Sequence, residues 1–325
     1  MQYVKLGNTG LDVSRICMGC MSFGDKSHPR ALAWARDKDE GRALIKRALE
    51  LGINFFDTAN VYSAGTSEEV TGAALRELAN RDEYVLATKV YFPMHDGPNG
   101  AGLSRKSIMT QVDASLKRLG TDYIDLYIIH RWDYNTPIEE TMQALNDIVR
   151  AGKVRYIGAS AMYAWQFQKA LHVSDKLGLA RFVSMQNHYN LMYREEEREM
   201  MPLCLDYGIA STPYSPYAGG RLVRVGESQR DALDAVARMK YDHAMQQDEE
   251  IIRRVAEVAE RLGISRAEVA MAWLLQKPAV TSPIIGPTKV EQIEGAVNAL
   301  NTKLSESDMQ YLEEPYTPHK VIGAL

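Results

Sequence analysis

The chain has 325 residues, of which 46% are hydrophobic and 25% charged, and its formal net charge is −4 at pH 7. This is the composition of a globular protein, and the weak negative charge argues against nucleic acid or an anionic membrane as a partner. No apolar run approaches the roughly 20 residues that span a bilayer, and the N-terminus lacks the apolar core of a secretory signal. Three cysteines do not suggest a disulfide framework. We therefore expect a cytoplasmic protein.

Two of the cysteines, Cys17 and Cys20, have the C-x-x-C spacing of redox and zinc sites. They lie in a strand-like run, however, where residues three apart point to opposite faces. No second pair of Cys or His residues has the spacing that would complete a zinc site. The pattern therefore favours small apolar side chains near a backbone turn, and we expect no metal.

The N-terminal region predicts a hairpin followed by the first buried strand. Residues 1–16 contain two short strand-like segments separated by the turn 7–10, which is typical of a β-hairpin. A buried strand is expected over residues 16–23. A polar loop then leads to an amphipathic helix over 39–50.

The same strand–helix unit then recurs along the chain. Further strands are expected at 53–57, 84–89, 123–129, 154–158, 182–186, 209–214 and 282–285, and helices at 67–78, 104–119, 137–149, 164–177, 195–206, 248–262, 265–276, 289–300 and 305–312. Eight strands that alternate with helices close a (β/α)8 barrel. An open doubly wound sheet usually carries a glycine-rich phosphate turn, which this sequence lacks. We predict an α/β fold, a (β/α)8 TIM barrel with additional C-terminal helices, as a single domain over residues 1–325.

Two stretches interrupt the regular pattern. Residues 217–247 form a long segment after the seventh strand, and a long loop at such a point is usually a lid or a mobile segment. The acidic run 194–199 is interpreted as a solvated helix start without a binding role, because acidic residues suit a helix N-terminus.

Ionisable side chains stand at the ends of three successive strands. Asp57 ends the second strand, Lys89 the third and His130 the fourth, and Tyr62 follows in the loop after the second. Each residue alone is ordinary: an Asp–Lys pair is often structural, and a lone histidine after apolar residues usually belongs to the core. Neighbouring strands of a barrel, however, would bring all four together at its C-terminal rim.

This grouping has the components of carbonyl reduction. A lysine beside a carboxylate forms a buried ion pair, and we expect the adjacent ammonium to pull the pKa of the Tyr62 phenol below about 10. Such a tyrosine can donate a proton to an oxyanion or accept one in reverse. The imidazole of His130 can orient a carbonyl oxygen by hydrogen bonding.

The sequence resembles the aldo-keto reductase superfamily, a family of NADPH-dependent (β/α)8 barrels, over nearly its whole length. The motifs that carry the resemblance are Leu6–Ser14, Asn54–Tyr62, Ala87–Val90 and Ile128–Asp133. The sequences of segments 131–141 and 189–200 are most similar to those of a bacterial and fungal subgroup near the potassium-channel β-subunits.

The resemblance implies a catalytic tetrad that matches the four rim residues. Tyr62 is then the general acid, Lys89 and Asp57 tune its pKa, and His130 orients the carbonyl. The hydride would come from the nicotinamide of NADPH, so no metal is needed.

The resemblance also implies cofactor contacts. Gln186 matches the glutamine that binds the nicotinamide carboxamide, Tyr214 the aromatic residue that stacks on the nicotinamide, and residues 215–222 the pyrophosphate loop. Thr288 and Lys289 match the binding site of the 2′-phosphate, which favours NADP over NAD. The full expected set is Cys20, Met21, Asp57, Ser160, Gln186, Tyr214, Ser215, Pro216, Gly220, Arg221, Gly286, Thr288, Lys289 and Gln292.

The sequence departs from the family pattern at two cofactor positions. Ala161 and Ala296 stand where many relatives carry a cofactor-contacting asparagine. On the residues alone, Lys289 is an ordinary lysine at a helix start, and 214–222 is a turn.

The expected substrate is a small-molecule carbonyl compound. Phe23, Tyr91 and Trp132 follow the first, third and fourth strands, so they would surround the nicotinamide and suit a small or flat aldehyde or ketone. Aromatic packing between loops explains them equally well. The sequence does not identify the physiological substrate or the preferred direction, and it leaves a homo-oligomer open.

Two other function classes are conceivable for the same barrel. One is a nucleotide-sensing regulatory subunit with slow turnover, as in the channel β-subunits; only five residues precede Leu6, too few for a pore-plugging segment. The other is a dehydratase or isomerase on the same barrel, which the intact tetrad argues against. A reductase is the favoured interpretation.

Overall fold

The computed structural model describes residues 1–224, 226 and 234–322. Its centre is a sheet of eight parallel strands in the order β10-β3-β4-β5-β6-β7-β8-β9. The strands are β3 (Cys17–Gly19), β4 (Phe55–Asp57), β5 (Val85–Val90), β6 (Ile124–Ile129), β7 (Val154–Ser160), β8 (Phe182–Gln186), β9 (Ala210–Ser211) and β10 (Ile284–Ile285). The two edges meet, because Ser211 pairs with Val280 and the amide of Ile284 donates to the carbonyl of Pro213 at 2.8 Å. The predicted (β/α)8 TIM barrel is confirmed.

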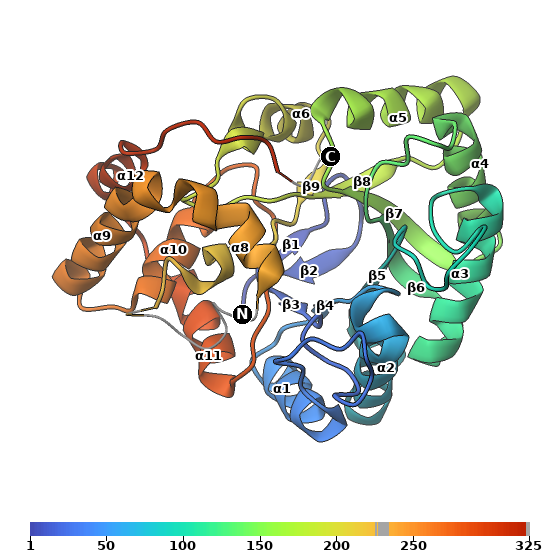
Figure 1. The fold of residues 1–325 in the computed structure, drawn as a ribbon, viewed down its shortest axis with the longest axis horizontal. Coiled ribbons are helices and arrows are strands. Elements are labelled where there is room, and N and C mark those ends of the chain that lie inside the picture. The colour runs from blue at the N-terminus through green and yellow to red at the C-terminus, as the bar shows by residue number, and fades with distance from the viewer. Residues whose placement is uncertain (225, 227–233, 323–325) are drawn as a thin grey trace.

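Helices surround the strands, and those of the C-terminal part gather on one side (Figure 1). Their bounds are α1 (Lys38–Glu50), α2 (Thr66–Leu78), α3 (Arg105–Leu119), α4 (Ile138–Arg150), α5 (Ala164–Leu177), α6 (Met200–Asp206), α8 (Ala235–Tyr241), α9 (Met245–Leu262), α10 (Arg266–Leu275), α11 (Val290–Asn298) and α12 (Glu306–Glu313). Several begin at a side-chain cap: Asp37 accepts from the amide of Glu40 at 3.1 Å, and Ser305 accepts from the amide of Asp308 at 3.1 Å. Such caps satisfy free backbone amides of the first turn.

The N-terminal hairpin lies against the interior of the barrel. Strands β1 (Tyr3–Lys5) and β2 (Asp12–Ser14) pair antiparallel. Leu6 and Val13 from this hairpin pack in one cluster with inward-facing strand residues such as Phe55. The predicted hairpin is therefore confirmed, and it contributes apolar side chains to the interior core.

Strand alternation determines which side chains enter the barrel. Phe55 on β4, Val85 and Ala87 on β5, and Leu126 and Ile128 on β6 all belong to this interior cluster. Their neighbours Phe56, Leu86 and Tyr127 instead pack in the cluster between strands and helices. Since successive strand residues alternate between faces, positions 57, 89 and 130 continue the inward-facing series.

Two segments differ from the sequence predictions. The helix expected over 195–206 is a 3₁₀ helix at Glu195–Glu197 followed by α6. The acidic run 194–199 is only partly solvated: Arg198 and Glu199 are exposed, whereas Glu195 accepts hydrogen bonds from Tyr316 Oη at 2.6 Å and from the amide of His319 at 2.9 Å. These tertiary contacts attach the C-terminal tail.

The expected long loop 217–247 contains secondary structure. A 3₁₀ turn at Ala218–Gly220, the helix α8 and a 3₁₀ turn at Asp242–Ala244 lie within it. Positions 225 and 227–233 of this expected loop lie outside the described residues. None of the helices in the described ranges combines the length and apolarity needed to cross a membrane.

Candidate active site

Asp57, Tyr62, Lys89 and His130 lie close together at the C-terminal ends of β4, β5 and β6; we call them the rim cluster. Asp57 and Lys89 are the terminal inward-facing residues of their strands, and β4 and β5 pair in parallel register with Asp57 opposite Ala87. Tyr62 begins a 3₁₀ helix after β4, where Ser63 and Ala64 adopt positive φ angles of 47° and 54°. This tight turn brings the Tyr62 phenol over the lysine.

The Lys89 ammonium connects the cluster. It donates hydrogen bonds to Asp57 Oδ1, to the carbonyl of Thr58 at 2.8 Å and to Tyr62 Oη at 3.2 Å. Its side chain is fully buried and that of Asp57 is 3% exposed. All three ammonium protons therefore have acceptors, so the charge is buried with its hydrogen bonds satisfied.

Burial and charge set the protonation states of the cluster. Burial alone would lower the pKa of Lys89, but the charge of Asp57 and the nearby phenol raise it above its usual value, so the ammonium stays charged. Burial raises the pKa of Tyr62, and the Lys89 ammonium only partly offsets that rise. The expectation that the lysine pulls the Tyr62 pKa below 10 is therefore wrong, and the phenol stays protonated at neutral pH.

His130 faces the phenol as a neutral imidazole. Its ring meets that of Tyr62 edge to face, with the centroids 5.8 Å apart. Burial, followed by the charges of Lys89 and Arg131, holds its pKa well below the usual range. Its Nδ1 is buried without a hydrogen-bond partner among the described residues. A neutral ring with an unused nitrogen can hydrogen-bond a ligand.

Gln186 and Ser160 lie opposite each other in the register of β7 and β8. The Gln186 amide donates from Nε2 to Asp57 Oδ2 at 2.9 Å, a contact that the sequence did not reveal. Asp57 therefore bridges the amide of Gln186 and the ammonium of Lys89. The hydroxyl of Ser160 is buried without a partner in the described part of the chain, as expected for a group that awaits a ligand.

Tyr214 lies between His188 and Lys240, neither of which was predicted as a site residue. The His188 ring stacks on it at a centroid distance of 5.3 Å and an interplanar angle of 4°. Lys240 Nζ, from α8, lies 4.3 Å from the centroid of the Tyr214 ring. A nicotinamide stacked on Tyr214 therefore requires the lysine to leave this position.

The expected pyrophosphate loop is strongly curved. Ser215, Ala218 and Gly220 have positive φ angles of 58°, 49° and 99°, and Pro216 is buried between them. Arg221 forms an ion pair with Asp242 through Nη2, while its Nη1 is buried without a partner in the described ranges. Half of the guanidinium is thus engaged within the protein, and half is left for a ligand.

The expected 2′-phosphate site lies at the start of α11. Gln292 accepts hydrogen bonds at its Oε1 from the amides of Thr288, at 2.7 Å, and Lys289, at 3.3 Å. Gly286 and Lys289 are exposed. The glutamine thus caps the amides that a phosphate would use, whereas the lysine side chain extends into solvent.

Two other expected cofactor residues follow β3. The amide of Cys20 donates to the carbonyl of Asp57 at 2.7 Å, and its carbonyl accepts from Ser67 Oγ at 2.7 Å. Its thiol is fully buried, so neither the side chain nor the backbone of Cys20 is free for a ligand. Met21 is exposed. Cys17 and Cys20 are both free thiols, and burial raises the pKa of each.

The three residues expected to contact substrate differ in accessibility. Phe23 is fully buried and belongs to the core cluster between strands and helices, so it does not face a ligand in this conformation. Tyr91 is half-buried. Trp132 is 9% exposed and lies 6.1 Å, centroid to centroid, from the exposed ring of Trp165. Phe92 was missed, although its ring lies 4.9 Å from that of His130.

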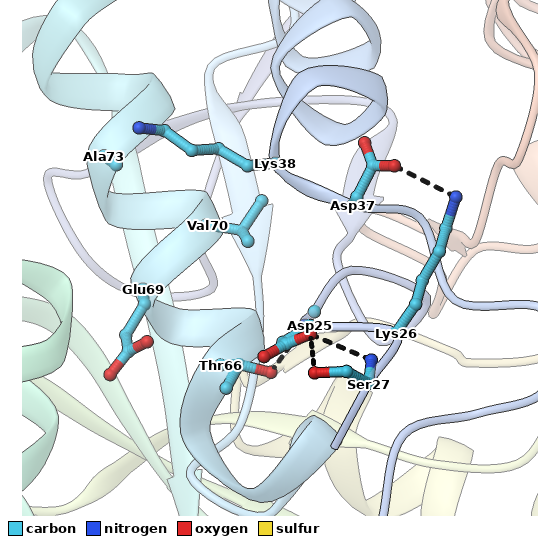
Figure 2. A pocket seen from close by; sticks show the side chains of 10 residues that line it. Asp25, Lys26, Ser27, Asp37, Lys38, Thr66, Glu69, Val70 and Ala73 are labelled. Carbon is cyan, nitrogen blue, oxygen red and sulfur yellow. Dashed lines mark hydrogen bonds and ion pairs between the residues drawn. The ribbon is translucent and has the colours of Figure 1, made fainter.

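A surface hollow of about 610 Å³ is lined by a separate set of residues (Figure 2). It is formed by the loop 24–27 and the first turns of α1 and α2. Lys26 in this hollow pairs with Asp37 at 3.0 Å and also with Glu40. The charge of Lys26 is thus paired within the protein, and no member of the rim cluster lines the hollow. In the described ranges, no group of three or more His, Cys, Asp or Glu residues could hold a metal ion.

The residues fit a polar cofactor beside the rim cluster. Ser160 Oγ, Tyr214 Oη and Arg221 Nη1 are buried and have no partner among the described residues. Since buried polar atoms are almost always paired, these three are candidates for hydrogen bonds to a ligand.

Comparison with known proteins gives consistent matches. Residues 15–316 match the profile described as the Aldo/keto reductase family. Versiconal hemiacetal acetate reductase of Aspergillus parasiticus is 43% identical in an alignment of 343 residues that covers 99% of this chain and 98% of the relative. A putative aryl-alcohol dehydrogenase of Schizosaccharomyces pombe is 42% identical and covers 99% and 98%. One from Saccharomyces cerevisiae is 39% identical and covers 98% of both chains.

Proposed function

Because this chain belongs to the aldo/keto reductase family, we propose that it is an NADPH-dependent reductase of small aldehydes and ketones. Family membership establishes an oxidoreductase and carbonyl reduction in general. The dependence on NADPH, the roles of the rim cluster and the small carbonyl substrate are our proposals. The observation that carries them is the fully buried Lys89 ammonium, hydrogen-bonded to both Asp57 and Tyr62.

Each residue of the rim cluster has one role in the proposed reaction. NADPH, when bound, supplies a hydride from its nicotinamide. Tyr62 holds its proton at neutral pH and gives it to the carbonyl oxygen as negative charge develops there. The Lys89 ammonium, kept charged by Asp57, stabilises the phenolate that remains. His130 orients the carbonyl oxygen by hydrogen bonding.

The names of the relatives support this chemistry. They describe a reductase acting on a hemiacetal acetate and two dehydrogenases of aryl alcohols, which interconvert carbonyl and alcohol groups in opposite directions. For this chain we propose a flat or aromatic carbonyl compound, in agreement with the ring of Phe92 beside His130. A cytoplasmic location also remains a proposal, based on the sparse cysteines.

A panel of aldehydes and ketones tests the reaction. NADPH oxidation is followed by absorbance with aliphatic, sugar and aromatic carbonyl compounds. The proposal expects turnover with at least one class at about 1 s⁻¹ or faster, which is within the ordinary range for enzymes. Very slow turnover with every compound would instead favour a nucleotide-sensing protein.

The cofactor preference needs its own measurement. Fluorescence titration compares NADPH with NADH for the wild type and for Lys289→Met. The exposed Lys289 ammonium at the start of α11 should favour the phosphorylated cofactor by about tenfold, and the methionine variant should lose this preference. Equal affinities of the wild type for the two cofactors would contradict this role of Lys289.

A further inference from the structure

Arg131, which directly follows His130, has no carboxylate partner among residues 1–224, 226 and 234–322. Its Nη1 donates to the carbonyl of His130 at 2.6 Å, and its guanidinium carbon lies 5.3 Å from the centroid of the Phe92 ring. The described residues include no ion pair to this arginine. The guanidinium is half-buried and retains N–H groups for a planar anion.

The neighbouring carboxylate forms no ion pair with Arg131 among the described residues. Asp133 accepts at Oδ2 from the amide of Leu103 and from Thr136 Oγ1, both at 2.8 Å, and at Oδ1 from the amide of Asn135 at 2.9 Å. Its oxygens therefore hold the loop after β6. Asp57, the acid of the rim cluster, is bound to Lys89 and Gln186.

A second cation faces the same space. Lys240 is 8% exposed and has no ion pair in the described part of the chain. Burial, followed by the charge of Arg131, lowers the pKa of Lys240 to about 7. The charge of Asp234 offsets this effect only in part. Two like charges held near each other are unfavourable, and an anion beside Arg131 would relieve this repulsion.

Several aromatic rings lie on the loops beside Arg131 and His130. Phe92 lies edge to face with both His130 and Tyr91, at centroid distances of 4.9 Å and 5.2 Å. Trp132 follows Arg131 and contacts Trp165, which is 57% exposed. A flat apolar body can thus pack on rings next to the proposed proton donor while a charged substituent reaches the arginine.

We propose that Arg131 is a specificity-determining residue that binds an anionic group, such as a carboxylate, on an aromatic carbonyl substrate. This deepens the proposed function and rests on it. The anion is assigned to the substrate because Arg131 is adjacent to His130 and lies over Phe92, whereas the expected cofactor phosphates belong to 215–222 and to the start of α11. Binding of a cofactor phosphate is the competing assignment, and it is an outcome of the test.

A matched pair of substrates isolates the charge. 4-Carboxybenzaldehyde and its methyl ester differ at the substituent far from the aldehyde. The wild type should reduce the acid with a kcat/KM about tenfold or more above that for the ester. Arg131→Met should lose this preference for the acid. Arg131→Lys, which keeps the charge but not the planar fork, should retain part of it.

Arg155→Met provides the control. Arg155 also lies over an aromatic ring, 4.1 Å from the centroid of Tyr123, and also donates to a backbone carbonyl, that of Gly152 at 3.2 Å. It stands at the N-terminal end of β7, away from the rim cluster. This variant should keep the wild-type ratio of acid to ester.

A binding measurement separates this inference from the proposed function. Calorimetry with 4-carbamoylbenzoate, whose amide is not reduced, should give binding to the NADPH-bound protein that weakens about tenfold or more in Arg131→Met. Equal rates for acid and ester, or a preference that survives Arg131→Met, would overturn the inference. So would a loss of NADPH affinity in that variant with the ratio unchanged, because the arginine would then serve the cofactor. If no carbonyl compound is reduced, the proposed function fails, and calorimetry alone decides the role of Arg131.

Discussion

The rim cluster and the α8 segment, residues 214–224 and 234–248, meet at the same end of the barrel but differ in how completely their polar groups are paired. In the rim cluster, the Lys89 ammonium has three acceptors. In the α8 segment, Tyr214 Oη, Tyr217 Oη and Arg221 Nη1 are buried without partners in the described ranges, and Lys240 has only the face of the Tyr214 ring.

The rim cluster is therefore preorganised by the protein, whereas the α8 segment has polar groups available to a ligand. Within the rim cluster, the Lys89 ammonium is fully paired with groups of the protein, so its geometry is held by the strands that carry it, as electrostatic stabilisation requires. The α8 segment leaves polar atoms without partners in the described ranges, so they are available to a ligand. Substitutions in the first region should therefore damage the folded protein, whereas some in the second should improve its stability.

The largest expected effect is that of Lys89→Met. The substitution leaves the Asp57 carboxylate buried beside no ammonium, and breaking one partner of a buried pair costs about 3–5 kcal/mol. Urea unfolding at pH 7 measures this loss. Lys153→Met removes a comparable contact with Asp113 at the surface and should cost at most about 1 kcal/mol. Equal losses in the two variants would contradict the distinction between the buried pair and a surface pair.

Lys240→Met should have the opposite sign. Removing a buried charge that has no ion pair in the described part of the chain should stabilise the protein at pH 7 by roughly 1–3 kcal/mol, as measured by urea unfolding. Lys117→Met, on the exposed face of α3, is the control for the loss of a charge.

The gain in stability of Lys240→Met over the wild type should depend on pH. Burial lowers the folded-state pKa of Lys240 from 10.5 to about 7, so between pH 7 and 10.5 the unfolded chain binds more protons than the folded protein. The stability of the wild type therefore rises with pH across this window relative to that of the variant. The difference in free energy of unfolding between Lys240→Met and the wild type should thus narrow between pH 7 and 9.5. If the free energies of unfolding of the wild type and of Lys240→Met changed equally with pH, burial would not lower the pKa of Lys240.

The smallest expected effect concerns the attachment of the tail to α9. His319 Nε2 lies 2.9 Å from Asp248 Oδ1. Burial alone would lower the pKa of His319, but the hydrogen bond and charge of Asp248 raise it above 6.5. A raised folded-state pKa contributes stability that is complete below pH 6.5 and lost as pH rises through the folded value.

His319→Gln should therefore be more destabilising at pH 5.5 than at pH 8.5, by roughly 1 kcal/mol. Urea unfolding at the two pH values measures this difference. His172→Gln on the exposed face of α5 is the control. An equal loss at both pH values would show that the Asp248 pair does not hold a charged imidazole.

The sequence predicted the elements in which the spacing of apolar residues determines which way the side chains point. Helix α5 was expected at 164–177 and covers Ala164–Leu177, because its apolar spacing and its closing glycine are local signals. Asp57, Lys89 and His130 were expected to converge because each ends an inward-facing series on adjacent strands. The prediction that Tyr62 joins them depended more on the family resemblance, since the turn that carries Tyr62 has unusual backbone angles.

Contacts between distant segments were not predictable in this way. The hydrogen bond from Gln186 to Asp57 joins residues 129 positions apart, and Lys240 reaches Tyr214 only because α8 folds back on the loop after β9. The acidic run around Glu195 seemed solvated because its partners, Tyr316 and His319, lie more than 100 residues away. Such pairings follow from packing and have no local signal in the sequence.

Tyr62→Phe tests the central claim most directly. The wild type and the variant are loaded with NADPH and mixed with an excess of an aldehyde that the wild type reduces, and stopped-flow absorbance follows a single turnover. Tyr123→Phe, at the opposite end of the barrel, is the control. The account predicts that hydride transfer slows by about 100- to 10,000-fold in Tyr62→Phe, while the affinity for NADPH stays within about twofold. A rate within about tenfold of the wild type, with NADPH bound, would contradict Tyr62 as the proton donor.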